Sequence, residues 1–460
     1  MTEFRIEKDT LGEVKVPEQA YYGPETARAL ENFKISGLSL QKRLIKSLAL
    51  IKKASAFANM KLNHLNEKIA RSIIKATDEV LGGKFDDQFM VDVFQAGAGT
   101  STNMNMNEVL ANRALEIIGE KKGNYSVIDP HDHVNKSQST NDTFHSAIHV
   151  AGYEATLKEL VPSLEILEAE LLTKSKEFSD IIKVGRTHLQ DAVPIRLGQE
   201  FSAYVSMIGH QKREILKVSD LLRELNLGGT AIGTGINAGK EFQTLVMEEI
   251  NELTELKFKT AENLFEATQN TDAILEVSGA LKTLAIILIK ITNDLRLMTS
   301  GPRAGFGEIT LPAILPGSSI MPFKKNPSIA EMVDMVGFQV IGNDATITLA
   351  CQAGQLELNV MMPIIAYNFL NSIEILTNAI KTFAEKCIRG IQVNIKKIEN
   401  DLERDLEVVT ALTPYTGYEK AAIIAKKAFE QNKTIRQILL EMKLFPEKKI
   451  DQILNLKKLT

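Results

Sequence analysis

The stretch ILEVSGALKTLAIILIKITNDLRLM, residues 274–298, has the clearest helical pattern in the chain. Its apolar side chains recur at intervals of three and four residues without a break. They are Ile274, Val277, Leu281, Leu284, Leu288, Ile291, Leu295 and Met298. A repeat of about 3.5 residues is typical of a long helix that packs against other helices along one stripe. The stretch therefore predicts one helix of a bundle.

Further long helices are predicted on both sides of this stretch. Two more seams follow the same pattern: Leu197 to Leu222, with one gap at Gln211, and Phe369 to Cys387. Residues 143–178 predict another helix, kinked near Pro162 because proline lacks the amide hydrogen that a helix interior needs. Helices this long bury their apolar stripes against one another, so we expect a central bundle.

The segment from Leu284 to Ile289 is apolar on nearly every face, with charges only at Lys282 and Lys290. A helix of one small bundle exposes one side to water, so an apolar surface all round indicates burial by further copies of the chain. We therefore expect a homo-oligomer.

Smaller, mostly helical parts are expected at both ends. Residues 1–37 are rich in turn-forming residues and predict an irregular segment with a small hairpin, and helical spacing starts at Leu40. The Lys- and Glu-rich C-terminal end has short helical patterns such as Ala421 to Phe429. We expect a mainly α protein with three domains: an N-terminal domain at 1–141, a central long-helix bundle at 142–397 and a C-terminal helical domain at 398–460.

The composition points to a small-molecule partner. Of 460 residues, 44% are apolar and 24% charged, and the net charge is −4. No basic block stands out and no apolar run reaches about 18 residues, so neither a nucleic acid nor a membrane is indicated. The N-terminus lacks a signal peptide's apolar core, and Cys351 and Cys387 do not make a disulfide framework. We expect a cytoplasmic enzyme.

Chemistry is indicated by the segment PGSSIMPFKKNP, residues 316–327, whose turn residues mark a loop that can move as a unit. Abstraction of a proton beside a carboxylate leaves an enediolate-like dianion, which fixed donors must stabilise. Ser318 and Ser319 offer a base and a donor, and Lys324 and Asn326 can hold a second carboxylate. A serine hydroxyl is a poor base unless its surroundings stabilise the alkoxide. A surface turn with a solvated lysine is the alternative.

Other polar segments lie between the predicted helices. The glycine-rich segment at 95–105 can approach an anion, but it lacks the spacing of a dinucleotide fingerprint and the lysine of a P-loop. Residues 131–142 carry more short polar side chains than the capping of one helix needs. In the polar loop 185–194, His188 can hold or release a substrate proton, a structural histidine being the alternative.

Metal binding is the rival interpretation of the other histidines. His131 with His133, and His145 with His149, have plausible ligand spacing. No glutamate lies between the latter pair and no cysteine is near, so we expect neither a metal nor a cofactor.

The chain resembles the aspartase/fumarase superfamily of lyases. The resemblance rests on Gly-Ser-Ser-x-Met-Pro-x-Lys-x-Asn-Pro at 317–327, and it extends from YYG at 21–23 through SGPRAG at 300–305 to GYEKAA at 417–422. It implies a cofactor-free enzyme for a small dicarboxylate substrate. It also implies a homotetramer with an extended central helical bundle and active sites built from three subunits.

The resemblance assigns roles to particular residues. Ser318 matches the catalytic base that takes a Cβ proton. The β-carboxylate and its aci form are bound by hydroxyl groups: Thr100, Ser139, Thr140 and Ser319. The α-carboxylate is held by Thr187, Lys324 and Asn326. Asn141 and His188 surround the amino group, and His188 is also a candidate catalytic residue.

Within the superfamily, the chain is most similar to the ammonia-lyases that split L-aspartate into fumarate and ammonia. Residues 267–272, ATQNTD, resemble these enzymes where class II fumarate hydratases usually have a His-Asp pair, and Val193 stands where hydratases usually carry threonine. A fumarate hydratase is the alternative function. A noncatalytic structural relative is a third, disfavoured because the site residues are present.

Overall fold

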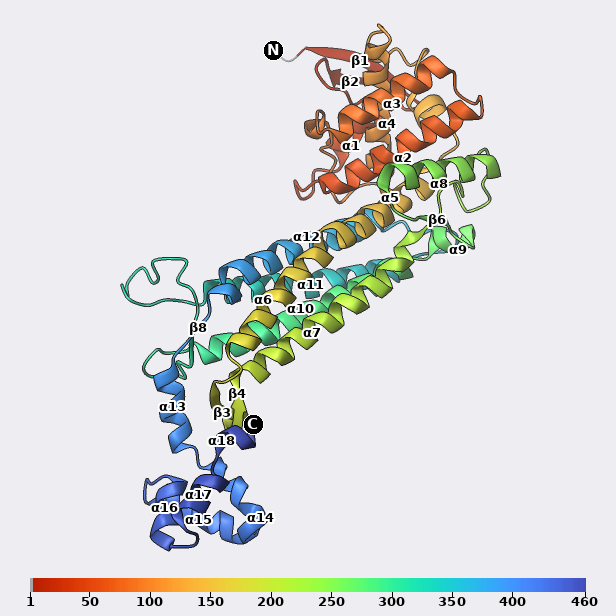
Figure 1. The fold of residues 1–460 in the computed structure, drawn as a ribbon. Helices are drawn as coiled ribbons and strands as arrows, with labels where there is room; N and C mark the ends of the chain where they lie inside the picture. Colours follow the sequence, from red (N-terminus) through yellow and green to blue (C-terminus); the bar gives the residue numbers. More distant parts are fainter. Residues whose placement is uncertain (1–2) are drawn as a thin grey trace. The chain divides into compact units, whose positions relative to one another are not determined.

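Helices make up most of the structure, as the apolar seams predict (Figure 1). The computed structural model describes residues 3–460. These residues form two compact units: the first holds the chain up to Val161, Arg213–Thr283 and Phe338–Leu376, and the second holds Pro162–Lys212, Leu284–Gly337 and Thr377–Thr460. The prediction of a mainly α protein is confirmed. The division at 141 and 397 stays a prediction.

The elements of the first unit are mostly helices. They are β1 (Phe4–Asp9), β2 (Gly12–Pro17), α1 (Pro24–Asn32), α2 (Lys42–Lys61), α3 (Glu67–Leu81), η1 (Asp86–Gln88), η2 (Gly97–Gly99), α4 (Thr100–Ile117), η3 (Pro130–Val134), α5 (Thr140–Ala155), η4 (Thr156–Leu160), η5 (Asp220–Arg223), β5 (Glu224–Leu225), α8 (Lys240–Thr254), β6 (Lys259–Thr260) and α9 (Leu264–Gln269). The hairpin predicted in the first 37 residues is confirmed as β1–β2.

The second unit combines short strands with short helices. They are β3 (Ile182–Thr187), β4 (Gln190–Arg196), β7 (Ile309–Thr310), η6 (Ile388–Gly390), β8 (Gln392–Val393), α13 (Ile395–Arg404), η7 (Glu407–Leu412), α14 (Thr413–Thr416), α15 (Tyr418–Glu430), α16 (Ile435–Met442), α17 (Glu447–Ile453) and α18 (Leu456–Leu459). The long helices contribute residues to both units: α6 (Val161–Glu177), α7 (Leu197–Ser219), α10 (Asp272–Met298), α11 (Ser328–Cys351) and α12 (Met362–Lys386).

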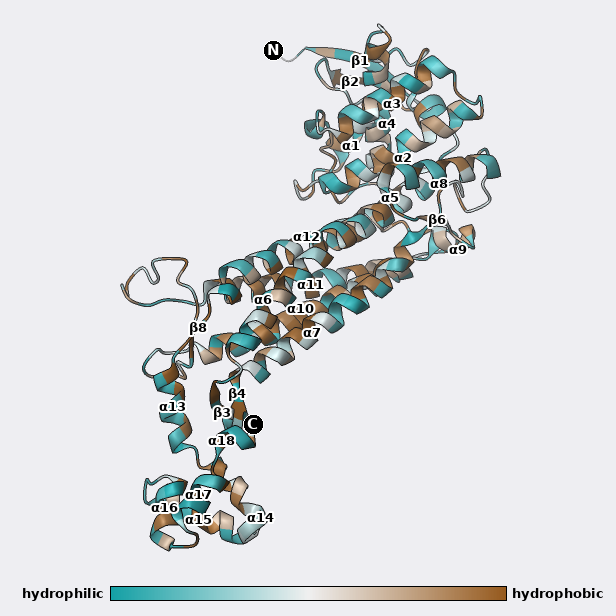
Figure 2. Cartoon of the chain, viewed as in Figure 1, coloured by the Kyte–Doolittle hydropathy of each residue, from teal (hydrophilic) through white to brown (hydrophobic). Residues whose placement is uncertain are grey.

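The predicted seams lie on buried faces of the long helices. Every seam residue of α10 is at most 4% exposed, and Phe201 of α7 and Phe369 of α12 are fully buried. Figure 2 shows hydrophobic residues along these helices. Burial of each large side chain is worth about 1.5–3 kcal/mol, so the seams supply much of the stability. No helix within residues 3–460 is both long and apolar enough to cross a bilayer.

The helix predicted over 143–178 is interrupted near Pro162. It starts as α5, passes through the π-helical segment η4 and continues as α6, in which Pro162 is the second residue. Proline cannot donate a hydrogen bond to the carbonyl four residues earlier, and the wider π turn places the irregularity directly before it. The structure thus has an irregularity directly before Pro162, and the kink expected there stays a prediction.

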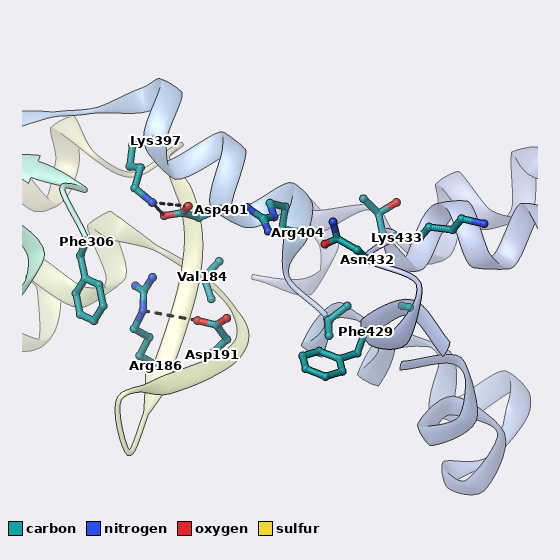
Figure 3. Close-up of a pocket in the computed structure, with 13 residues that line it drawn as sticks. Val184, Arg186, Asp191, Phe306, Lys397, Asp401, Arg404, Phe429, Asn432 and Lys433 are labelled. Carbon is teal, nitrogen blue, oxygen red and sulfur yellow. Dashed lines mark hydrogen bonds and ion pairs between the residues drawn. The ribbon is translucent and has the colours of Figure 1, made fainter. Parts of the chain in front are cut away.

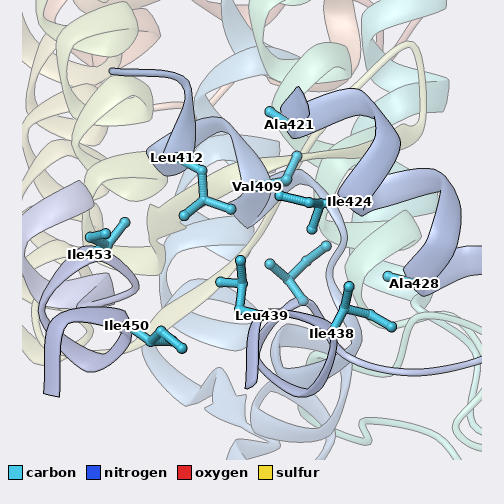
Figure 4. Packing of buried hydrophobic residues seen from close by; sticks show 10 residues of the cluster. Val409, Leu412, Ala421, Ile424, Ala428, Ile438, Leu439, Ile450 and Ile453 are labelled. Carbon is cyan, nitrogen blue, oxygen red and sulfur yellow. The ribbon is translucent and has the colours of Figure 1, made fainter. Parts of the chain in front are cut away.

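The C-terminal helices share a small core of their own. Figure 4 shows side chains from η7, α15, α16 and α17 pointing toward one another. The buried members are Val409, Leu412, Ala421, Ile424, Ala428, Ile435, Ile438, Leu439, Ile450 and Ile453. The helical pattern predicted from Ala421 to Phe429 is confirmed within α15.

Strands differ from the sequence prediction at one segment that carries two predicted site residues, Thr187 and His188. Residues 185–194 were expected to be a polar loop, but most of them lie in the antiparallel hairpin β3–β4, with a bulge between Val184 and Gly185. The strands contain few apolar residues, so their alternation is too weak to predict a sheet. The hairpin changes how His188 is presented.

His145 and His149 are buried in α5. The ring nitrogens of His145 have no hydrogen-bond partner in the described part of the chain, and His149 Nδ1 contacts the carbonyl of Glu224 at 2.8 Å. Burial, and then the neighbouring His149, lower the pKa of His145 to about 3. Within residues 3–460 there is no cluster of three or more side chains of the kinds that bind metals.

We predict that His145→Leu makes the protein less sensitive to acid. A histidine kept neutral in the fold and charged in the unfolded chain favours folding above its ordinary pKa of 6.5, and this stability is lost as pH falls toward 3. Between pH 6 and 4, the free energy of unfolding of the leucine variant should fall by about 1.4 kcal/mol less per pH unit than that of the wild type. Urea unfolding at several pH values measures this, with the exposed His210→Leu as control. Parallel pH profiles for wild type and His145→Leu would contradict it.

Candidate active site

A pocket of about 790 Å³ in the first unit collects three of the predicted site residues. Thr100 lies at the start of α4, and Ser139 and Thr140 lie at the start of α5. The other walls come from residues 131–138 and from Thr230 to Asn237. The pocket thus brings the glycine-rich segment and the polar run before α5 together, and the roles that the resemblance gives to these three residues stay a prediction.

Ser139 and Thr140 are fixed by the cap of α5. The Ser139 side chain accepts the Asn141 amide at 3.2 Å, and Asp142 Oδ1 accepts the Ser139 amide at 2.9 Å. Asp142 Oδ2 also accepts the amides of Gly228 and Thr230 at 3.0 and 2.9 Å. Burial raises the pKa of Asp142 to about 6, although these amides favour the carboxylate.

Asn141 is held beside this pocket. Its side-chain Nδ2 donates to the carbonyl of Ala231 at 2.7 Å, and its own carbonyl accepts from Asn226 at 3.0 Å. These bonds tie the start of α5 to the glycine-rich segment after Asn226. The amide hydrogens at a helix N-terminus favour an anion, so this end of the pocket suits a carboxylate.

Thr100 follows a tight backbone turn, η2. Gly99 has φ +85°, and a Cβ at this position would lie 2.5 Å from the ring of Phe144. Only glycine allows both the left-handed conformation and the close approach to α5. The glycine therefore places the exposed Thr100 at the pocket edge.

Thr187 and His188 lie at the tip of the β3–β4 hairpin. His188 and Leu189 both have positive φ, 54° and 59°, as in a type I′ turn, which normally uses Asn and Gly. Each such residue costs about 1–2 kcal/mol, and Leu189 is also 62% exposed. Strain of this kind in an exposed turn is typical of a functional segment.

A buried carboxylate anchors the same hairpin. Glu308 is 1% exposed, and its Oε2 lies 2.9 Å from Lys183 Nζ. It also forms an ion pair with Arg186, and Lys183 and Arg186 both belong to β3. Figure 3 shows Arg186 extending toward Phe306 and paired with Asp191. The cavity in this view is about 450 Å³, and three of the basic groups that line it have acidic partners: Arg186 with Asp191, Lys397 with Asp401 and Lys433 with Glu441.

The loop at 316–327 is closed on itself at its base. The Ser318 amide donates to the Lys324 carbonyl at 3.3 Å, and a Cβ on Gly317 would lie 1.9 Å from that oxygen. Ser318 Oγ accepts the amides of Ile320 and Met321 at 3.3 and 3.2 Å. Ser319, Lys324 and Asn326 are exposed. The loop is thus a preformed turn around the Ser318 hydroxyl.

The predicted site residues therefore fall into three groups. Thr100, Ser139 and Thr140 share the pocket of the first unit, with Asn141 beside it. Thr187 and His188 share the hairpin tip, and Ser318, Ser319, Lys324 and Asn326 share the loop. Within residues 3–460 no hydrogen bond or ion pair joins the hairpin tip to the loop.

Several polar residues near the first group received no role from the sequence. Asn103, Asn135, Gln138 and Thr230 line the pocket, and Lys52 donates to two of them. The asparagine-rich pattern at 103–107 was the available signal. No sequence signal indicated Lys52, because the pattern of its helix is that of an ordinary amphipathic helix.

A model of the lyase family matches residues 12–342, and a model of the fumarase C C-terminus matches residues 408–460. The chain belongs to the aspartase/fumarase superfamily of lyases. The resemblance seen in the sequence is thereby confirmed, and members of this family act on small dicarboxylates.

Relatives within the superfamily cover the whole chain. An aspartate ammonia-lyase of Bacillus sp is 49% identical over 99% of this chain and 97% of its own, and a class II fumarate hydratase of Bacillus subtilis is 47% identical over 98% of both. A solved class II fumarase from Schistosoma mansoni has a TM-score of 0.95 at 40% identity, covering 98% of each chain. A solved fumarate lyase:delta crystallin from Brucella melitensis, bound to cobalt, has a TM-score of 0.96 at 44% identity over the full length of both.

We predict that Glu308→Gln destabilises the second unit by about 2–4 kcal/mol, because the buried Lys183 and the partly buried Arg186 lose their shared carboxylate and keep only the more exposed Glu200 and Asp191. Asp191→Asn is the matched control, since its side chain is 65% exposed and 3.8 Å from Arg186. Urea unfolding measures both. A loss for Glu308→Gln no larger than for the control would contradict the anchoring role.

Proposed function

We propose that the chain is an aspartate ammonia-lyase, in which the Ser318 alkoxide takes a Cβ proton of L-aspartate and the Cα–N bond then breaks to give fumarate and ammonia. The observation that carries this is the pair of amides, from Ile320 and Met321, directed at Ser318 Oγ. Hydrogen bonds to the charged form of a group favour that form, so the turn supports an alkoxide.

The remaining groups suit the charges of the reaction. Proton removal places negative charge on the β-carboxylate, where the hydroxyls of Thr100, Ser139 and Thr140 and the start of α5 can stabilise it. Lys324 has no acidic partner within residues 3–460, so its ammonium is free to hold the spectator carboxylate with Asn326. Thr187, Asn141 and His188 complete the proposal around the α-carboxylate and amino group.

A homotetramer is part of the same proposal, with different copies supplying the three groups of residues. Apolar side chains on the long helices support it. Ile286 of α10 is 51% exposed, and Met335, Phe338 and Leu349 lie on one face of α11 with exposures of 66%, 61% and 64%. Large apolar side chains grouped this way are typical of a subunit interface.

The choice of an ammonia-lyase rests on residues 267–272 and Val193, which resemble that branch. Identities of 49% and 47–48% to ammonia-lyases and fumarate hydratases do not separate the two. A fumarate hydratase is therefore the second candidate, supported by the likeness to the Schistosoma mansoni enzyme.

We predict that the purified protein forms fumarate from L-aspartate and not from L-malate. Because fumarate absorbs in the ultraviolet and both substrates absorb far less, one spectrophotometric assay tests both reactions. Fumarate from malate alone would make the chain a hydratase, and fumarate from neither would favour a noncatalytic protein.

We predict that Ser318→Ala abolishes turnover without changing the fold, because the alanine has no group to accept the proton. A loss of at least about 1,000-fold in kcat is expected for removal of the base. Ser126→Ala, a serine outside the proposed site, is the matched control. Light scattering should give the mass of a tetramer for both variants. Turnover that survives in Ser318→Ala would remove this serine as the base.

A further inference from the structure

Lys52 of α2 is fully buried beneath the pocket of the first unit. Its Nζ donates to Asn135 Oδ1 at 2.8 Å and to Gln138 Oε1 at 3.0 Å. Burial lowers the pKa of Lys52 to about 7, while nearby Asp142 favours the charged form. Both the ammonium and the neutral amine have the two N–H groups that these bonds need. Lys52 thus acts as a donor in either form.

The orientation of Asn135 follows from its neighbours. Its Nδ2 donates to the Gln138 carbonyl at 3.3 Å, which leaves Oδ1 to accept from Lys52. Oδ1 also accepts from Asn103 Nδ2 at 3.3 Å and Asn107 Nδ2 at 3.2 Å. A backbone carbonyl at one end and a lysine at the other leave the amide no alternative orientation.

The fixed orientation of Asn135 also fixes the orientation of the Asn103 amide, which contacts the pocket residue Thr140. Since its NH₂ group faces Asn135 Oδ1, the same group donates to Thr140 Oγ1 at 3.0 Å. Its Oδ1 lies 3.3 Å from the Thr143 hydroxyl, which also donates to the Ser139 carbonyl at 2.9 Å. Thr140 Oγ1 is therefore an acceptor toward Asn103. No other hydrogen bond of this hydroxyl occurs within residues 3–460, so its proton is left for the pocket.

We propose that Lys52, Asn135 and Asn103 are positioning residues that fix the Thr140 hydroxyl as a donor toward a substrate carboxylate. The chain of bonds starts at a donor, and its two ends on the protein side are buried, since Lys52 is 0% and Asn103 1% exposed, while Asn135 between them is partly buried. A hydroxyl that is already oriented loses no rotational freedom on binding and need not break a bond to the protein. The inference rests on the proposed function in one respect, namely that the ligand is a dicarboxylate.

The test reverses the bond at Asn103. Asn103→Asp replaces the donor by an acceptor of almost the same shape, so the Thr140 hydroxyl turns toward residue 103 and presents its lone pairs to the pocket. KM for the turned-over substrate should rise about 10- to 100-fold, as expected for one hydrogen bond to a charged group. The value of kcat should fall as well, because the Thr140 hydroxyl also stabilises the charge that develops on the carboxylate during proton removal.

The matched control is Asn105→Asp. Asn105 lies on the same helix, is also 1% exposed and donates to the Gln88 carbonyl at 3.1 Å, away from the pocket. It should lower the melting temperature as Asn103→Asp does while leaving KM within about twofold of wild type. Equal KM values for the two variants would overturn the inference.

A double-mutant cycle separates orientation of Thr140 from a general effect of charge. If Asn103 acts through the Thr140 hydroxyl, Asn103→Asp should raise KM much less in a Thr140→Val background than in wild type. Multiplicative effects of the two substitutions on KM would count against the inference.

A wild type without turnover on aspartate or malate would overturn the proposed function, and the network would then be judged by neutron diffraction. The structure of the deuterated wild type should show the Thr140 deuterium directed away from Asn103 and an Asn103 deuterium directed at Thr140 Oγ1. The opposite arrangement would overturn the inference. This test needs only the wild type, so it does not depend on the folding of any variant.

Discussion

The buried carboxylate of Asp142 is the interaction on which the first unit's pocket depends. One oxygen closes the cap of α5 through the Ser139 amide, and the other receives the amides of Gly228 and Thr230. A single side chain therefore fixes two segments far apart in sequence, both of which line the pocket. Each of these amides would be costly to bury without a partner, so the carboxylate supports the cavity as well as the helix.

The other two groups of candidate residues are held differently. The hairpin tip keeps His188 and Leu189 in a costly left-handed conformation, and a buried ion-pair network around Glu308 holds the strands behind it. The loop at 316–327 depends on its own backbone bonds instead. A loop that is held by its own bonds, and not by its neighbours, can move as a unit, as an enzyme needs if its charged intermediate is to be enclosed and then released.

The sequence predicted the parts of the structure that repeat and missed those that depend on unique contacts. The heptad seam of α10, the irregularity before Pro162 and the cap of α5 follow from local patterns, and each is found. The hairpin did not follow, because a His-Leu pair occupies a turn that usually signals itself by Asn-Gly. Lys52 carried no signal at all, since its partners lie more than 80 residues away along the chain.

The closed base of the 316–327 loop has a consequence for protein engineering. At Gly317 even a methyl group would collide with the Lys324 carbonyl, whereas the side chains of Ile320 and Phe323 point into water and are more than 80% exposed. The base of the loop, at Gly317 and Lys324, thus tolerates almost no substitution. The exposed positions Ile320 and Phe323 tolerate a great deal. A library that randomises Ile320 and Phe323 alone could be screened for new amine or acid selectivity. The backbone turn around the Ser318 hydroxyl would stay unchanged in every variant.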